Sequence, residues 1–267
     1  MKQEFINYEL LENFAPNVFL SKPPYPWHDF HRFLTPEGFA ALYENFPPLD
    51  VFEVHSDMER VYGQRPHNRY YLAYEESVYA RAQAGNGNKG TVKQANLPEA
   101  WRMLMDEFET SERYRNFIKR LFQVSEFQVR YAWHVGVTNS EVSPHVDGDK
   151  KIGTHIFYFN TSEDWNPAWG GATLVLGSKL TSAMNPDFND FTAAEAAQIT
   201  DNHSFLFRNG PHSWHGVKPL TCPEGSYRRL FNVIFEVPEK SEKAVASPLS
   251  AIKRLFRGRR TQPETSY

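Results

Sequence analysis

The sequence is poor in cysteine, long apolar runs and excess charge of either sign. Its single cysteine, Cys222, rules out an intramolecular disulfide and favours a reducing compartment. No stretch approaches the roughly 18 apolar residues that a membrane-spanning helix needs. Residues 1–20 lack the basic start and unbroken apolar segment of a secretory signal. We therefore expect a cytoplasmic protein without a transmembrane segment.

The charges nearly cancel, with 29 Lys and Arg against 32 Asp and Glu, giving a formal net charge of −3. A dedicated nucleic-acid-binding protein is normally basic, so we expect no nucleic-acid partner. Aromatic residues make up 15% of the 267 residues, including 21 Phe and 13 Tyr. This composition is typical of sheets that face each other across a filled interior.

Three segments in the N-terminal half carry apolar residues at helical spacing. The first begins where Thr35 can cap a helix and Pro36 can occupy its first turn, and it ends at Pro47. The second begins near Pro98, and the third starts around Tyr114. We expect the apolar faces of these helices to form core: Phe39, Leu42, Tyr43 and Phe46; Trp101, Leu104, Met105 and Phe108; Phe117, Ile118, Leu121 and Phe122.

From about residue 124 the sequence becomes rich in short alternating segments of strand-forming residues. One helix is predicted to interrupt them, because Thr192 and Glu195 form a capping box before Ala196, Ala197 and Ile199. Helices followed by strands predict a mainly β domain with flanking helices over residues 1–237, helical at about 1–123 and strand-rich at about 124–237. The predicted strands are residues 127–133, 154–159, 172–176, 204–207 and 230–235.

Two segments look unsuited to the core. Residues 84–90 hold three glycines, which favours a surface loop, with a lid over a site as the alternative. Residues 238–267 form a polar and then basic tail, in which Ser247 can begin a short amphipathic helix. The basic part, residues 247–260, would contact a membrane surface or a partner, or else dock on its own domain.

The residues that suggest chemistry begin with His145 and Asp147. Residues two apart in a strand point to the same side, so one imidazole and one carboxylate can converge on an ion. A third ligand can come from His215, which follows a predicted strand and a turn, although His212 lies only three residues away. Two histidines and one carboxylate with open positions beside them are typical of non-haem Fe(II) oxygenases.

Five short motifs then occur in an order that resembles a known family. The motifs are His145-x-Asp147, Tyr158-Phe159-Asn160, Trp169-Gly170-Gly171-Ala172-Thr173, Trp214-His215-Gly216-Val217 and Arg228-Arg229. Over about residues 125–237 they resemble the Fe(II)/2-oxoglutarate-dependent dioxygenases, in the prolyl-4-hydroxylase-like branch. The resemblance implies a double-stranded β-helix, or jelly roll, with Fe(II) held by His145, Asp147 and His215, since the family's distal histidine precedes a pair such as Gly-Val.

The same resemblance implies a basic residue that binds the distal carboxylate of 2-oxoglutarate. Arg228 and Arg229 lie on opposite faces of their strand, and the family's pattern selects Arg228. A guanidinium suits this task because it offers a fork of charge-assisted donors. Tyr131 and Thr154 are further co-substrate candidates by resemblance, and an ordinary strand role is the alternative for both.

The implied activity is oxidation of a peptide side chain, amino acid or small metabolite, using O₂ and releasing succinate and CO₂. The presence of Asp147 favours hydroxylation over halogenation, since halogenating relatives have a small residue there. Rival interpretations are a cupin-like metalloenzyme without 2-oxoglutarate, in which Arg228 has no purpose, and a non-catalytic β-sandwich binding module. Candidate substrate contacts are residues 65–69, 84–90 and 165–169; His134, His155 and His203 are interpreted as structural.

Overall fold

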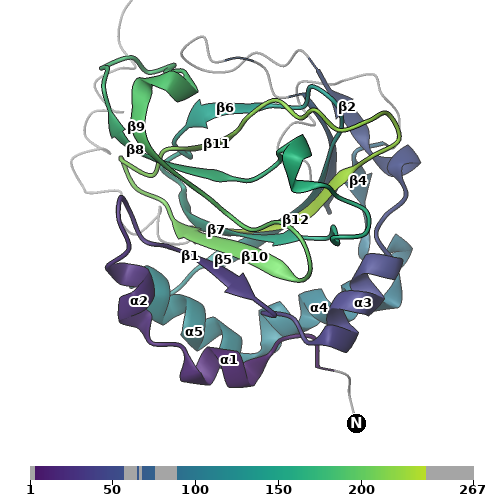
Figure 1. Cartoon of the computed structure of the whole chain (residues 1–267). Coiled ribbons are helices and arrows are strands. Elements are labelled where there is room, and N and C mark those ends of the chain that lie inside the picture. The colour runs from purple at the N-terminus through teal and green to yellow at the C-terminus, as the bar shows by residue number, and fades with distance from the viewer. Residues whose placement is uncertain (1–3, 57–64, 66–67, 76–88, 239–267) are drawn as a thin grey trace, which may run out of the picture.

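Two antiparallel sheets lie face to face, and the helices cover the outer face of the larger sheet (Figure 1). This computed structural model describes residues 4–56, 65, 68–75 and 89–238. Its helices are α1 (Tyr8–Asn13), α2 (Pro16–Leu20), α3 (Pro36–Glu44), α4 (Glu99–Thr110) and α5 (Glu112–Phe122). Its strands are β1 (Trp27–His31), β2 (Glu53–His55), β3 (Arg69–Tyr74), β4 (Thr91–Val92), β5 (Gln128–Gly136), β6 (Val142–His145), β7 (Lys151–Tyr158), β8 (Leu174–Lys179), β9 (Phe191–Ala196), β10 (His203–Arg208), β11 (His215–Val217) and β12 (Arg228–Glu236).

The order of the strands is that of a jelly roll. In the larger sheet the order is β1-β10-β7-β12-β5-β3-β2, with the short β4 parallel to β3, and in the smaller sheet it is β6-β11-β8-β9. Strands that are distant in sequence, such as β7 and β12, pair along their length. The prediction of a mainly β, double-stranded β-helix fold with flanking helices is confirmed.

The predicted helices in the N-terminal half are confirmed, and their ends follow local chemistry. Thr35 caps α3 by accepting a hydrogen bond from the backbone N–H of Gly38, at 3.1 Å, and Pro36 occupies the first turn. Ser111 caps α5 in the same way. The apolar faces of α4 and α5 are buried against the larger sheet, and each fully buried side chain of this size contributes about 1.5–3 kcal/mol.

Two predictions about secondary structure are wrong. Residues 1–123 are not only helical, because β1, β2, β3 and β4 come from this part and extend the larger sheet at both edges. Residues 191–196 form strand β9 rather than a helix that starts at Thr192. The backbone of β9 pairs with β8, with Ala196 opposite Leu174, and these inter-strand hydrogen bonds replace those that a helix would have made.

Both faces of the larger sheet are buried, and this determines where a site can form. In β7, Phe157 packs against the helices, whereas Ile156 and Tyr158 face the smaller sheet. In β12 the same division separates Phe231 from Leu230. We call the space between the two sheets the interior, and polar side chains that enter it are the candidates for function.

Some predictions fall outside the described residues. These are the expected helix and basic segment at 247–260 and most of the glycine-containing loop at 84–90. Within the described part of the chain, no helix is both long enough and apolar enough to cross a membrane.

Candidate metal centre

The two histidines of the predicted metal site lie side by side on neighbouring strands. His145 ends β6 and His215 begins β11, and the register of the smaller sheet places them directly opposite each other. Their ring centroids are 4.3 Å apart. Asp147 follows β6 by two residues, so its carboxylate points to the side of the strand that carries the His145 ring.

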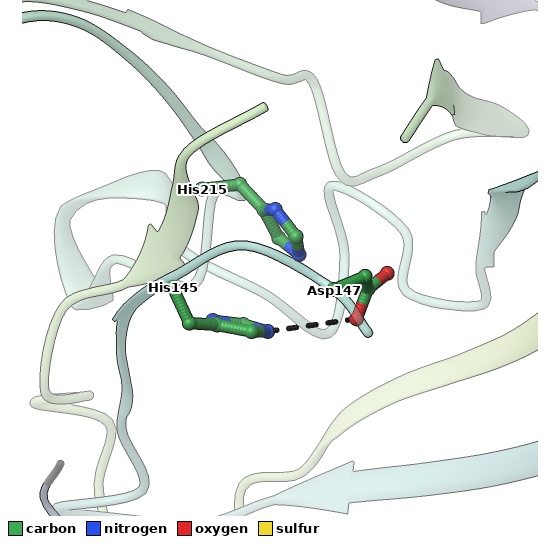
Figure 2. Close-up of side chains that lie close together, drawn as sticks. All are labelled: His145, Asp147 and His215. Carbon is green, nitrogen blue, oxygen red and sulfur yellow. Dashed lines mark ion pairs between the residues drawn. The ribbon is translucent and has the colours of Figure 1, made fainter. Parts of the chain in front are cut away.

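The three side chains converge on one point, as Figure 2 shows. One potential ligand atom from each of His145, Asp147 and His215 lies within 4.8 Å of the other two, and Nε2 of His145 is 3.8 Å from Oδ1 of Asp147. Ligand atoms bound at about 2.1 Å to one ion at right angles lie about 3 Å apart. Small shifts of these side chains therefore suffice for the donor set to fit a divalent transition-metal ion.

Backbone carbonyl groups set the orientation of both rings. Nδ1 of His145 lies 3.0 Å from the carbonyl oxygen of Ser143, and Nδ1 of His215 lies 2.9 Å from that of Ser213. An Nδ1–H that donates to a carbonyl leaves Nε2 with the lone pair that a metal ion needs. Phe207 packs on the His215 ring at 4.6 Å, and this contact further restricts its rotation.

Asp147 is nearly buried but remains ionised. Burial raises the pKa of its carboxyl. The Lys151 ammonium and the imidazoles of His215 and His145 together lower this pKa by more than burial raises it, so it lies well below its ordinary value. Nζ of Lys151 lies 2.6 Å from Oδ1 of Asp147. His212, the alternative to His215, is exposed and lies outside the cluster.

Arg228 extends into the interior between the two sheets. It is 7% exposed, its Nε donates to the carbonyl oxygen of Gly171 at 2.5 Å, and its guanidinium lies 5.4 Å from the ring centroid of Tyr158. The φ of Gly171 is +91°, which favours glycine, and an added Cβ would also lie 2.9 Å from Cδ of Arg228. Within the described residues Arg228 forms no ion pair with a carboxylate.

Arg229 points to the opposite face, as the alternation of β12 predicts. It forms an ion pair with Asp164, and its guanidinium lies 4.5 Å from the ring centroid of Tyr43 in α3. These contacts lie on the helix-covered side of the larger sheet. Of the two arginines, only Arg228 can reach a molecule in the interior.

The interior also contains buried polar atoms without partners. Among the described residues, Oγ1 of Thr154 and Oδ1 of Asn232 have no hydrogen-bond partner, whereas the Tyr158 hydroxyl is 2.7 Å from Oγ1 of Thr173. Buried polar groups are normally hydrogen-bonded, so these two atoms are available to a polar ligand. Together with a buried guanidinium that lacks a carboxylate, they fit a small dicarboxylate such as 2-oxoglutarate.

The prediction for Tyr131 is corrected by the structure. Tyr131 lies in the core between the larger sheet and the helices, stacked on Phe231 at 5.8 Å and facing Phe108. Its neighbour Ala132 faces the other side of the sheet. Because of this parity, Tyr131 cannot contact a co-substrate held in the interior.

Sequence reasoning missed a line of polar side chains across β2, β3, β5 and β12. Nε2 of His55 is 2.6 Å from Oε1 of Glu53, and the His55 ring stacks on Tyr71 at 5.0 Å. Tyr71 meets the ring of His134 at 5.2 Å, and Nδ2 of Asn232 donates to Nε2 of His134 at 3.2 Å. Burial, aided by nearby cations, lowers the pKa of His134 well below its ordinary value, so its ring is neutral.

The signal for part of this line was present in the sequence. Strand alternation places Asn232 on the Arg228 face of β12, and Tyr158 on the Thr154 face of β7. No pattern in the sequence indicated that β2 and β3 pair next to β5, so the approach of Glu53 and His55 to His134 could not be inferred.

Comparison with known proteins gives no match to a family model and none to a curated sequence. Solved structures do match. A prolyl-4-hydroxylase from Pseudomonas putida superposes with a TM-score of 0.54 at 13% identity, covering 85% of this chain and 100% of that one. SnoK, a non-haem α-ketoglutarate-dependent carbocyclase from nogalamycin biosynthesis, superposes with a TM-score of 0.53 at 12% identity, covering 96% of this chain and 96% of that one. A Trichoplax adhaerens prolyl hydroxylase in complex with a peptide superposes with a TM-score of 0.50 at 15% identity, covering 90% of this chain and 94% of that one.

The fold is that of the Fe(II)/2-oxoglutarate oxygenases. In this chain, the oxygenase fold brings a His-Asp-His cluster to the edge of the smaller sheet and a buried arginine to the facing strand β12. The identities are low, so the likeness establishes the oxygenase fold, and function must be argued from the side chains.

Proposed function

We propose that this chain is an Fe(II)/2-oxoglutarate-dependent oxygenase that hydroxylates its substrate and releases succinate and CO₂. The observation that carries the proposal is the convergence of His145, Asp147 and His215 within 4.8 Å, in a fold shared with enzymes of this type. A facial set of two imidazoles and one carboxylate leaves adjacent positions for a chelating co-substrate and O₂.

Each side chain has a defined task in this proposal. His145, Asp147 and His215 hold Fe(II), and the bound iron supplies the O₂ activation that no protein side chain can provide. Arg228 binds the distal carboxylate of 2-oxoglutarate, and Tyr158 supports that contact from the neighbouring strand β7. Thr154 and Asn232 offer hydrogen bonds to polar atoms in the interior, and the apolar side chains around them limit access of water.

The substrate would lie beside the polar line of His55, Tyr71 and His134. Burial lowers the pKa of both histidines, so they act as neutral hydrogen-bonding groups rather than as cations. Such groups suit hydroxyl or amide functions, which occur in a peptide side chain, an amino acid or a small metabolite. The Trichoplax prolyl hydroxylase binds a peptide, which keeps peptides within this range.

The rival interpretations account for fewer features. A cupin-like metalloenzyme without 2-oxoglutarate has no use for a buried arginine that lacks a carboxylate among the described residues. A non-catalytic β-sandwich module leaves both Arg228 and the convergence of the three ligand side chains without a purpose.

The test uses metal and co-substrate binding together with turnover. Under anaerobic conditions, Fe(II) and 2-oxoglutarate should give the visible charge-transfer absorption of a chelated complex with the wild-type protein. His145→Ala and Asp147→Ala should lose this absorption and the release of succinate, while circular dichroism shows an intact fold. His212→Ala is the matched control and should behave as wild type, since His212 is exposed. Wild-type absorption from either ligand variant would disprove the assignment.

A further inference from the structure

Lys151 contacts Asp147 in a way that the proposed function does not use. Lys151 begins β7, and the turn before it is closed by its backbone N–H, which donates to the carbonyl oxygen of Gly148 at 3.0 Å. Its Nζ lies 2.6 Å from Oδ1 of Asp147. The Lys151 side chain is 28% exposed and that of Asp147 only 9%, so this ion pair is largely shielded from solvent.

The oxygen that contacts Lys151 is also the one that lies close to His145. Oδ1 of Asp147 accepts from Lys151 and lies 3.8 Å from Nε2 of His145. An ion bound between the two side chains would take this same oxygen. A divalent ion and an ammonium group on one carboxylate oxygen repel each other, and this repulsion is strong where water is excluded.

The shielding of Asp147 explains why a cation is needed there before any metal binds. An ionised carboxylate removed from water is strongly destabilising unless a partner neutralises it. Of the groups that keep this carboxyl ionised, the Lys151 ammonium contributes most, ahead of the imidazoles of His215 and His145. A lysine can also withdraw, because its long side chain has several rotatable bonds.

We propose that Lys151 is a stand-in cation for the metal: it neutralises Asp147 in the metal-free protein, and metal binding displaces its ammonium group. This inference rests on the proposed function only in that Asp147 binds the metal. Lys151 is then a positioning residue, and its effect on the affinity for the metal follows from its effect on the stability of the metal-free protein. Whatever free energy the ion pair adds to the metal-free fold is subtracted from the affinity for the metal.

The experiment compares wild type with Lys151→Met in two measurements. Calorimetric titration with Mn(II) should show affinity about tenfold to a hundredfold tighter in the variant, the range expected for one charged hydrogen bond. Thermal unfolding without metal should show a Tm lower by about 3 to 10 °C. The two changes should agree when expressed as free energies, because they close one thermodynamic cycle.

Three further variants separate this role from others. Lys151→Arg keeps the charge and should bind Mn(II) as wild type does. Lys150→Met removes the same charge from the adjacent exposed residue and should leave the affinity for Mn(II) unchanged. If Lys151→Met does not accumulate, Lys151→Gln removes the charge but keeps a donor, and the same directions are expected. In an Asp147→Asn background, loss of Lys151 should no longer lower the Tm.

The outcomes distinguish this inference from the proposed function. If the wild type binds no Mn(II), both are overturned. If the wild type binds Mn(II) but Lys151→Met binds it equally or more weakly, only the stand-in role is overturned. That result would mean that Lys151 stays on Asp147 in the metal-bound protein.

Discussion

Replacing Arg228 by methionine tests the co-substrate site directly. The substitution preserves the length and much of the apolar stem of the side chain but removes the guanidinium that enters the interior. In the structure this group contacts the Gly171 carbonyl oxygen and the Tyr158 ring and has no carboxylate partner among the described residues. The proposed function assigns the missing carboxylate to 2-oxoglutarate.

The expected loss of binding is large. A hydrogen bond to a charged group contributes about 1.5–3 kcal/mol, and a factor of ten in affinity is about 1.4 kcal/mol. Loss of the fork should therefore weaken 2-oxoglutarate binding by about tenfold to a hundredfold or more. The effect on folding should be small by comparison. Leaving the Gly171 carbonyl oxygen unpaired costs about 1–3 kcal/mol, and removing a buried charge gives a similar gain.

The assay is calorimetric titration of the Mn(II)-loaded protein with 2-oxoglutarate and with pyruvate, which has the chelating keto acid but no distal carboxylate. The wild type should prefer 2-oxoglutarate strongly, whereas Arg228→Met should bind the two with nearly equal affinity. Arg229→Met is the matched control. It removes the ion pair with Asp164 on the outer face, so it should lower Tm but leave the preference unchanged.

A retained preference for 2-oxoglutarate in Arg228→Met would refute the reasoning, because the distal carboxylate would then have another partner. A lost preference in Arg229→Met would refute it as well, since that guanidinium lies outside the interior.

Two further predictions concern strain and pH. Gly171→Ala should lower both Tm and affinity for 2-oxoglutarate, because φ is +91° and the new Cβ would lie 2.9 Å from Cδ of Arg228; wild-type values for both would contradict this. Burial, with help from Lys22, lowers the pKa of His28 to about 4. The unfolded chain then binds more protons than the folded protein below about pH 6.5, so the free energy of unfolding should fall as the pH drops from about 6.5 towards 4. In urea titrations across this range, His28→Leu should lose less of its free energy of unfolding than the wild type does.

The alternation of β12 shows how far sequence reasoning reached. A period of two separates Arg228 and Asn232 from Arg229 and Phe231 in any strand, and the structure confirms this division. In β5 the same rule places Tyr131 and Ala132 on opposite faces, but it does not say which face looks at the smaller sheet. Both faces of β5 are buried, so the pattern of apolar residues does not distinguish them.

Local chemistry was a reliable guide only where no distant strand competed with it. The Thr35 cap and its following proline predicted α3 correctly, because the helix satisfies its own backbone. The similar pattern at Thr192 and Glu195 predicted a helix, but pairing with β8 made the segment an edge strand. Edge pairing depends on the position of β8 in the sheet, which no local pattern reveals.

The amino-acid sequence by itself determined the chemical types of the site: two imidazoles, one carboxylate, and an arginine on a known face of its strand. Tertiary structure alone decided that Tyr131 lies outside the interior and that Lys151 contacts Asp147. It also brings His215, which the family resemblance had selected over His212, next to His145. The physical reason is that donor type and side-chain parity are properties of a local segment. Which segments face each other depends on hydrogen bonds between strands far apart in the chain.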